Sequence, residues 1–78
     1  MPPSRIIEDV MVGKTALQDQ PQAIQSACQL EIYNRACRIL DLETKLERRA
    51  EINRTPEKLR PYIEAEVMRV WRMRNEQA

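Results

Sequence analysis

The chain has 78 residues, of which 42% are hydrophobic and 32% charged, with thirteen basic side chains against twelve acidic ones. This length allows one small domain, and the composition is too apolar and too mixed in charge sign for a disordered tail. The longest uncharged run, residues 20–30, is too short and too rich in glutamine for a membrane-spanning helix, and the N-terminus does not resemble a signal peptide. We expect a single domain over residues 1–78, with no membrane association and a cytoplasmic location.

The residue types needed for the commonest catalytic and metal sites are missing or isolated. There is no histidine, and no phosphate-binding loop or nucleophile–base spacing occurs. On one helix Cys28 and Cys37 would lie on opposite faces and about 13 Å apart along the axis, too far for a disulfide. The sequence therefore predicts two reduced thiols, no metal, no cofactor, no catalytic residues and no enzymatic activity.

Three helices are predicted in chain order. Residues 5–12 carry apolar side chains at helical spacing and are followed by Gly13, a typical helix stop. After a connection over residues 13–20, Pro21 can occupy the first helical position of a second helix. No glycine or proline then occurs before Asn53, so we expect one helix over residues 21–53, about 50 Å long.

The third helix is predicted over residues 56–75. Thr55 is a good N-cap and Pro56 fits the first helical position. Pro61 cannot donate to the carbonyl four residues back, so one helical turn at 56–60 should be followed by a kink or restart at Pro61. The short turn at 53–55 makes the second and third helices antiparallel neighbours. The predicted fold class is all-α, a short N-terminal helix plus a long antiparallel helical hairpin.

Helical periodicity separates two apolar stripes on the long helix. The first stripe runs nearly its full length and consists of Cys28, Ile32, Ala36, Ile39, Leu42, Leu46 and Ala50. The third helix has one stripe, which should pack against the first stripe near Ile39, Leu42 and Leu46 and consists of Leu59, Ile63, Val67 and Val70. The hairpin would bury these two stripes against each other.

The second stripe consists of Leu30, Tyr33, Cys37 and Leu40, whose spacing is typical of a helix-to-helix contact. The third helix does not cover it in the predicted hairpin, because it packs against the first stripe. Either the first helix returns onto it, or another protein does, which could be a second copy of this chain. The sequence leaves these alternatives open, and with them the oligomeric state.

The predicted function is a non-enzymatic protein–protein interaction module: an adaptor, assembly factor or inhibitor. The apolar contact would use Leu30, Tyr33, Cys37 and Leu40, and a polar contact would use the outward arginines Arg69 and Arg72. The alternative is a nucleic-acid-associated regulatory protein. Residues 35–78 hold eleven basic and eight acidic side chains, and an arginine-rich segment there includes Trp71.

Overall fold

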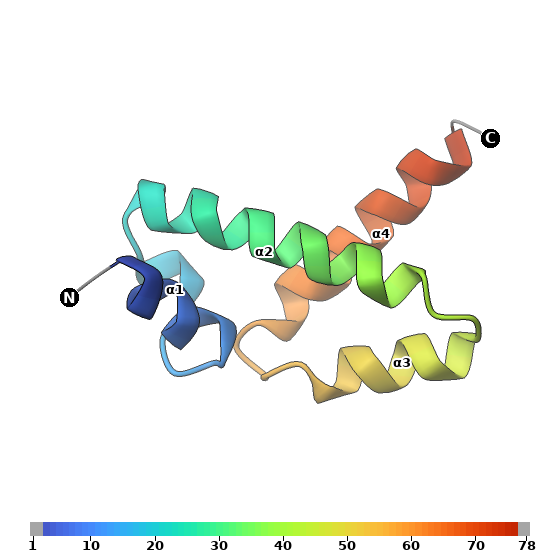
Figure 1. Ribbon diagram of the computed structural model, residues 1–78, viewed down its shortest axis with the longest axis horizontal. Coiled ribbons are helices and arrows are strands. Elements are labelled where there is room, and N and C mark those ends of the chain that lie inside the picture. The colour runs from blue at the N-terminus through green and yellow to red at the C-terminus, as the bar shows by residue number, and fades with distance from the viewer. Residues whose placement is uncertain (1–2, 77–78) are drawn as a thin grey trace.

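The computed structural model describes residues 3–76, and every element within that range is helical (Figure 1). The predicted all-α class is therefore confirmed. In chain order the elements are α1 (Pro3–Met11), the short 3-10 helix η1 (Leu17–Asp19), α2 (Gln22–Leu40), α3 (Lys45–Arg54) and α4 (Arg60–Glu76). None of these helices is both long and apolar enough to cross a lipid bilayer.

Helix α1 begins at Pro3, two residues before the predicted start, because the first turn of a helix needs no proline N–H. Its end is fixed at Gly13, which has a φ of +83°, a conformation that favours glycine. The N–H of Gly13 donates to the carbonyl of Val10 over 3.0 Å, and the N–H of Lys14 donates to the backbone carbonyl of Asp9 over 2.8 Å. These bonds satisfy carbonyls at the helix end, so Gly13 stops the helix as predicted.

The prediction of one continuous helix over residues 21–53 is wrong, because the chain turns between Leu40 and Lys45. The hydroxyl of Thr44 caps α3 by accepting a hydrogen bond of 3.1 Å from the N–H of Glu47. The guanidinium of Arg48 reaches back and donates to the carbonyl of Leu42 over 2.9 Å. A local signal for this break was present, since Thr44 and Glu47 stand at the spacing of a capping box.

The break changes the path of the chain after α2. Helix α3 returns beneath α2, and α4 then crosses behind α2 toward the C-terminus (Figure 1). The predicted hairpin of two long helices is replaced by this arrangement, although the last helix and α2 do make the most extensive helix–helix contact. The N–H groups of Leu59 and Arg60 donate to the carbonyl of Pro56, so a single turn precedes α4 and the helix restarts beside Pro61, as predicted.

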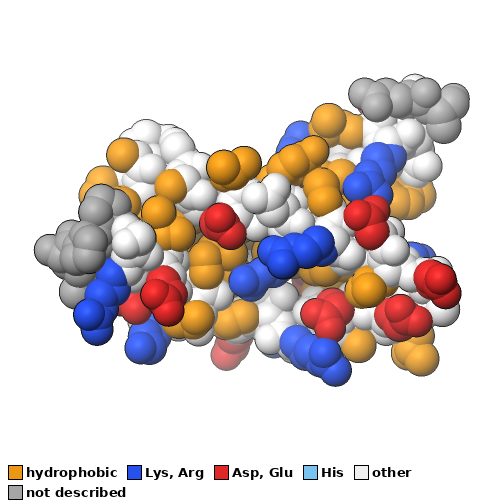
Figure 2. Space-filling view, in the orientation of Figure 1, with side chains coloured by type: hydrophobic (Ala, Val, Ile, Leu, Met, Phe, Trp, Pro, Cys, Tyr) orange, Lys and Arg blue, Asp and Glu red, His pale blue; other side chains and the backbone are white. Residues whose placement is uncertain are grey.

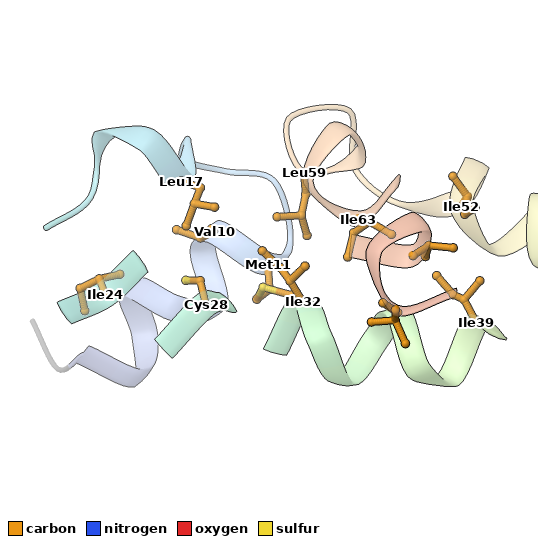
Figure 3. Packing of buried hydrophobic residues seen from close by; sticks show 13 residues of the cluster. Val10, Met11, Leu17, Ile24, Cys28, Ile32, Ile39, Ile52, Leu59 and Ile63 are labelled. Carbon is orange, nitrogen blue, oxygen red and sulfur yellow. The ribbon is translucent and has the colours of Figure 1, made fainter. Parts of the chain in front are cut away.

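The core joins all four α-helices and η1 (Figure 3). Helix α1 packs against the first half of α2, where Val10 lies near Cys28 and Met11 near Ile32. The predicted stripe of the last helix is buried as expected. The main stripe of α2 is buried only as far as Ile39; the remaining members, Leu42, Leu46 and Ala50, are half-buried or exposed because the chain has turned.

A matched pair of alanine substitutions tests the end of the buried stripe. Ile39→Ala should reduce the free energy of unfolding by about 2–5 kcal/mol, because it leaves a cavity under α4. Leu46→Ala should change it by less than about 0.5 kcal/mol, because 81% of Leu46 is exposed. Urea denaturation measures both values. Similar losses for the two variants would indicate that α2 continues as one helix beyond Leu40.

A second prediction concerns Gly13. A Cβ atom at this position would lie 2.5 Å from the Cβ of Pro56, in addition to the strain of a positive φ. Gly13→Ala should therefore destabilise the fold by at least about 1–2 kcal/mol in urea denaturation. Thr15→Ala, at an exposed position of the same connection, is the control and should stay within about 0.5 kcal/mol of the parent. A Gly13→Ala variant as stable as the parent would show that the turn has another conformation.

Candidate functional site

The predicted second stripe is not covered by the first helix. Leu30 is 61% exposed and Tyr33 39% exposed, whereas Cys37 and Leu40 are half-buried at the edge of the core. Helix α1 occupies the opposite side of α2, against Cys28 and Ile32. Figure 2 shows hydrophobic side chains along the upper edge of the molecule, where α4 rises behind α2. The sequence left two alternatives open for the second stripe, covering by the first helix or by another protein, and α1 does not cover it.

Tyr33 and Cys37 lie close to the arginines of α4. A hydrogen bond with Cys37, together with its charge, raises the pKa of the Tyr33 hydroxyl, and the nearby Arg69 and Arg74 partly oppose this shift. The guanidinium of Arg69 donates to both carboxylate oxygens of Glu66, which raises the pKa of Arg69.

The arginines nearest Tyr33 are already engaged within the chain. Arg69 also donates to the sulfur of Met73 over 3.0 Å, and Arg74 forms an ion pair of 3.1 Å with Asp41. Arg72 is also exposed, and within residues 3–76 it forms no ion pair. The predicted pair therefore combines one arginine that is bonded within the chain, Arg69, with one that forms no ion pair.

A groove of about 880 Å³ lies between α3 and α4. It exists because α3 buries a single side chain, Ile52, near its C-terminal end, so its first half does not close onto α4. Three exposed apolar side chains line the groove: Leu46, Met68 and Trp71, the last two 49% and 53% exposed. The rest of the apolar lining is more buried and consists of Leu40, Ile52 and Val67.

The charged side chains lining the groove all belong to α3 and are all basic: Lys45, Arg48 and Arg49. Within residues 3–76 none of them forms an ion pair. One of them, Arg48, is held in place by its hydrogen bond to the carbonyl of Leu42. The groove thus combines an apolar lining with positive charge along one side.

The sequence predicted only part of this groove. Of the six predicted site residues, Leu40 alone lines it. The sequence placed Leu46 in the buried first stripe and Trp71 only in an arginine-rich segment of the C-terminal half. The position of Leu46 was wrong because residues 45–54 were predicted to continue the second helix, whereas they form the separate helix α3. The capping-box spacing of Thr44 and Glu47 was the signal that could have corrected this prediction.

No protein-family model, curated protein or solved structure matches the chain. Within residues 3–76, acidic and cysteine side chains nowhere gather into a group of three that could hold a metal ion. The candidate site is therefore defined by its shape, its apolar lining and its charge.

The environment of Tyr33 gives a prediction of pH dependence. Because the folded-state pKa of Tyr33 is raised, its contribution to stability is present at neutral pH and is lost as the pH rises through that pKa. Cys37→Ala should lower the pKa of Tyr33, since Cys37 is the main cause of the shift and the two arginines remain. Tyrosinate absorbance against pH, in a Tyr62→Phe background that leaves one tyrosine, measures it. An unchanged titration would show that Cys37 does not contact the hydroxyl.

Proposed function

We propose that this protein is an interaction module that binds an amphipathic helix of a different protein in the groove between α3 and α4. The observation that carries the proposal is the exposure of Leu46, Met68 and Trp71 along one groove of about 880 Å³. Grouped apolar side chains that remain in water favour association, and tryptophan and methionine are frequent anchors of interfaces.

The shape of the groove supports a helix as the bound segment. Two helices, α3 and α4, form its walls, and an amphipathic helix can lay its apolar face between such walls. Apolar side chains three or four positions apart on that helix would contact Trp71 and Met68 on one wall and Leu46 on the other. Burial of these three exposed side chains would supply most of the binding free energy.

The charge of the groove supports a partner other than a second copy. In a symmetric dimer the same surface of each chain meets its equivalent, which would bring two sets of Lys45, Arg48 and Arg49 together. Neither set contributes a carboxylate to the groove, so such a dimer would place like charges close to one another. A partner helix with Asp or Glu residues beside its apolar face would instead pair with them.

A photo-cross-linking experiment tests the proposal. The cross-linking residue p-benzoyl-phenylalanine replaces Leu46 in the groove or, in the matched control, Leu30, which is exposed on α2 outside the groove. Irradiation in the cells that make the protein should give, at position 46, a cross-linked segment of another protein with helical apolar spacing and flanking acidic residues. Combining it with Met68→Ala and Trp71→Ala should reduce the yield about tenfold or more.

Three results would contradict the proposal. Cross-links between two copies of the chain would indicate a homodimer in place of a different partner. Cross-links from position 30 and none from position 46 would show that the partner binds the stripe of Leu30 and Tyr33 instead of the groove. A yield unaffected by Met68→Ala with Trp71→Ala would show that the apolar lining of the groove does not bind the partner.

A nucleic-acid function is the second candidate, and Trp71 in a groove with three basic side chains is the observation that favours it. An aromatic ring can stack on a base while basic side chains bind phosphates. Fluorescence of Trp71, the single tryptophan of the chain, reports binding of a single-stranded oligonucleotide directly. A nucleic-acid site requires affinity that falls steeply with salt concentration, whereas the apolar contacts of the proposed helix site depend on salt much less.

A further inference from the structure

A second hollow, of about 380 Å³, lies between the C-terminal halves of α2 and α3. Its lining shares no residue with the groove: Arg35, Arg38, Ile39 and Leu42 come from α2 and the turn after it, and Glu51, Arg54, Thr55 and Pro56 come from α3 and the segment that follows. The proposed interaction with a partner helix leaves this hollow unused.

Three arginines line the hollow. Arg35 and Arg38 stand on adjacent turns of α2, and Arg54 faces them from α3. Arg54 is paired with Glu51 over 2.8 Å, but Arg35 and Arg38 form no ion pair within residues 3–76. Figure 2 shows basic side chains exposed over the middle of α2 and near the end of α3. Three positive charges and one negative charge in one hollow favour the binding of an anion.

The rest of the lining is largely apolar and restricts which anion fits best. Ile39 is buried, and Leu42 and Pro56 are half-buried, so together they present hydrocarbon beside the arginines. The hydroxyl of Thr55 donates its proton to the carbonyl of Glu51, so this proton is already used within the chain. Arginine binds phosphate oxygens in pairs through its planar fork. An apolar group attached to the phosphate could contact the hydrocarbon surface.

We propose that the hollow between α2 and α3 binds a phosphate monoester whose organic group is small and apolar. Arg35 and Arg38 hold the phosphate, and Ile39, Leu42 and Pro56 contact the organic group. Glu51 opposes binding, because its carboxylate lies in the same hollow and occupies Arg54. A free small molecule and a phosphorylated side chain of another protein share this chemistry.

Phenyl phosphate is the probe, titrated into the isotope-labelled full chain while NMR follows the backbone and arginine Nε–H signals. It should bind at a single site and more tightly than inorganic phosphate, and phenol should not bind. Arg35→Gln combined with Arg38→Gln should weaken the binding about tenfold or more. Glu51→Gln should strengthen it about two- to fivefold, because it removes a negative charge and releases Arg54. Arg5→Gln, an exposed arginine on α1, is the matched control and should leave it unchanged.

The outcomes separate the site from general attraction of anions to a basic surface. Equal weakening by Arg5→Gln and by the double variant, or equal affinity for phenyl phosphate and inorganic phosphate, would overturn the proposal, as would absence of binding. A peptide with one phosphotyrosine distinguishes the two sources of ligand: tighter binding than phenyl phosphate indicates a phosphorylated protein, and weaker binding a free molecule. Circular dichroism of each variant establishes that the chain is folded during the titration.

Discussion

The reversal of the chain between Leu40 and Lys45 is the constraint on which the rest of the structure depends. The Thr44 cap and the hydrogen bond from Arg48 to the carbonyl of Leu42 replace the backbone bonds that a continuing helix would make. Because α3 returns beneath α2, it comes to lie beside both α2 and α4 and forms a wall of both hollows. A continuous helix would remove both.

The far end of α3 is held by contacts from the next segment. Ile52 is buried in the core, and Thr55, 4% exposed, donates to the carbonyl of Glu51. The guanidinium of Arg60 donates to the carbonyls of Asn53 and Thr55, which satisfies acceptors at the end of the helix. The C-terminal end is therefore fixed by burial and side-chain bonds, whereas the N-terminal end relies on its cap and on Arg48. This asymmetry is why the groove opens beside the first half of α3.

The two hollows differ in chemistry because they lie along different faces of the same helix. The face of α3 toward α4 carries Leu46 and Ile52 between basic residues, which suits the burial of an apolar helix face. The face toward α2 carries Glu51 and Arg54 and is opposed by two more arginines, which suits a small anion. A short helix with one buried side chain thus presents both of its flanks as binding surfaces.

The sequence by itself determined the elements whose signals are local. Apolar spacing predicted α1 and the buried stripe of α4, Gly13 marked the end of α1 through its positive φ, and Pro61 marked the restart of α4. The all-α class followed from the same signals. The spacing also placed Leu30 and Tyr33 on a face of α2 distinct from its core stripe, and both are exposed in the structure.

Only the tertiary structure decided where α2 ends and which apolar side chains remain exposed. Residues 41–44 contain no helix breaker. A continuing helix would keep its backbone hydrogen bonds there, whereas the reversal loses them and gains the contacts that α3 makes when Ile52 is buried. The helical spacing of apolar residues gives no information about the contacts that α3 gains. It assigned Leu46 to the core, whereas the reversal places Leu46 in one open groove with Trp71, Leu40 and three basic side chains. The candidate sites depend on the packing of α3, a contact between segments distant in sequence.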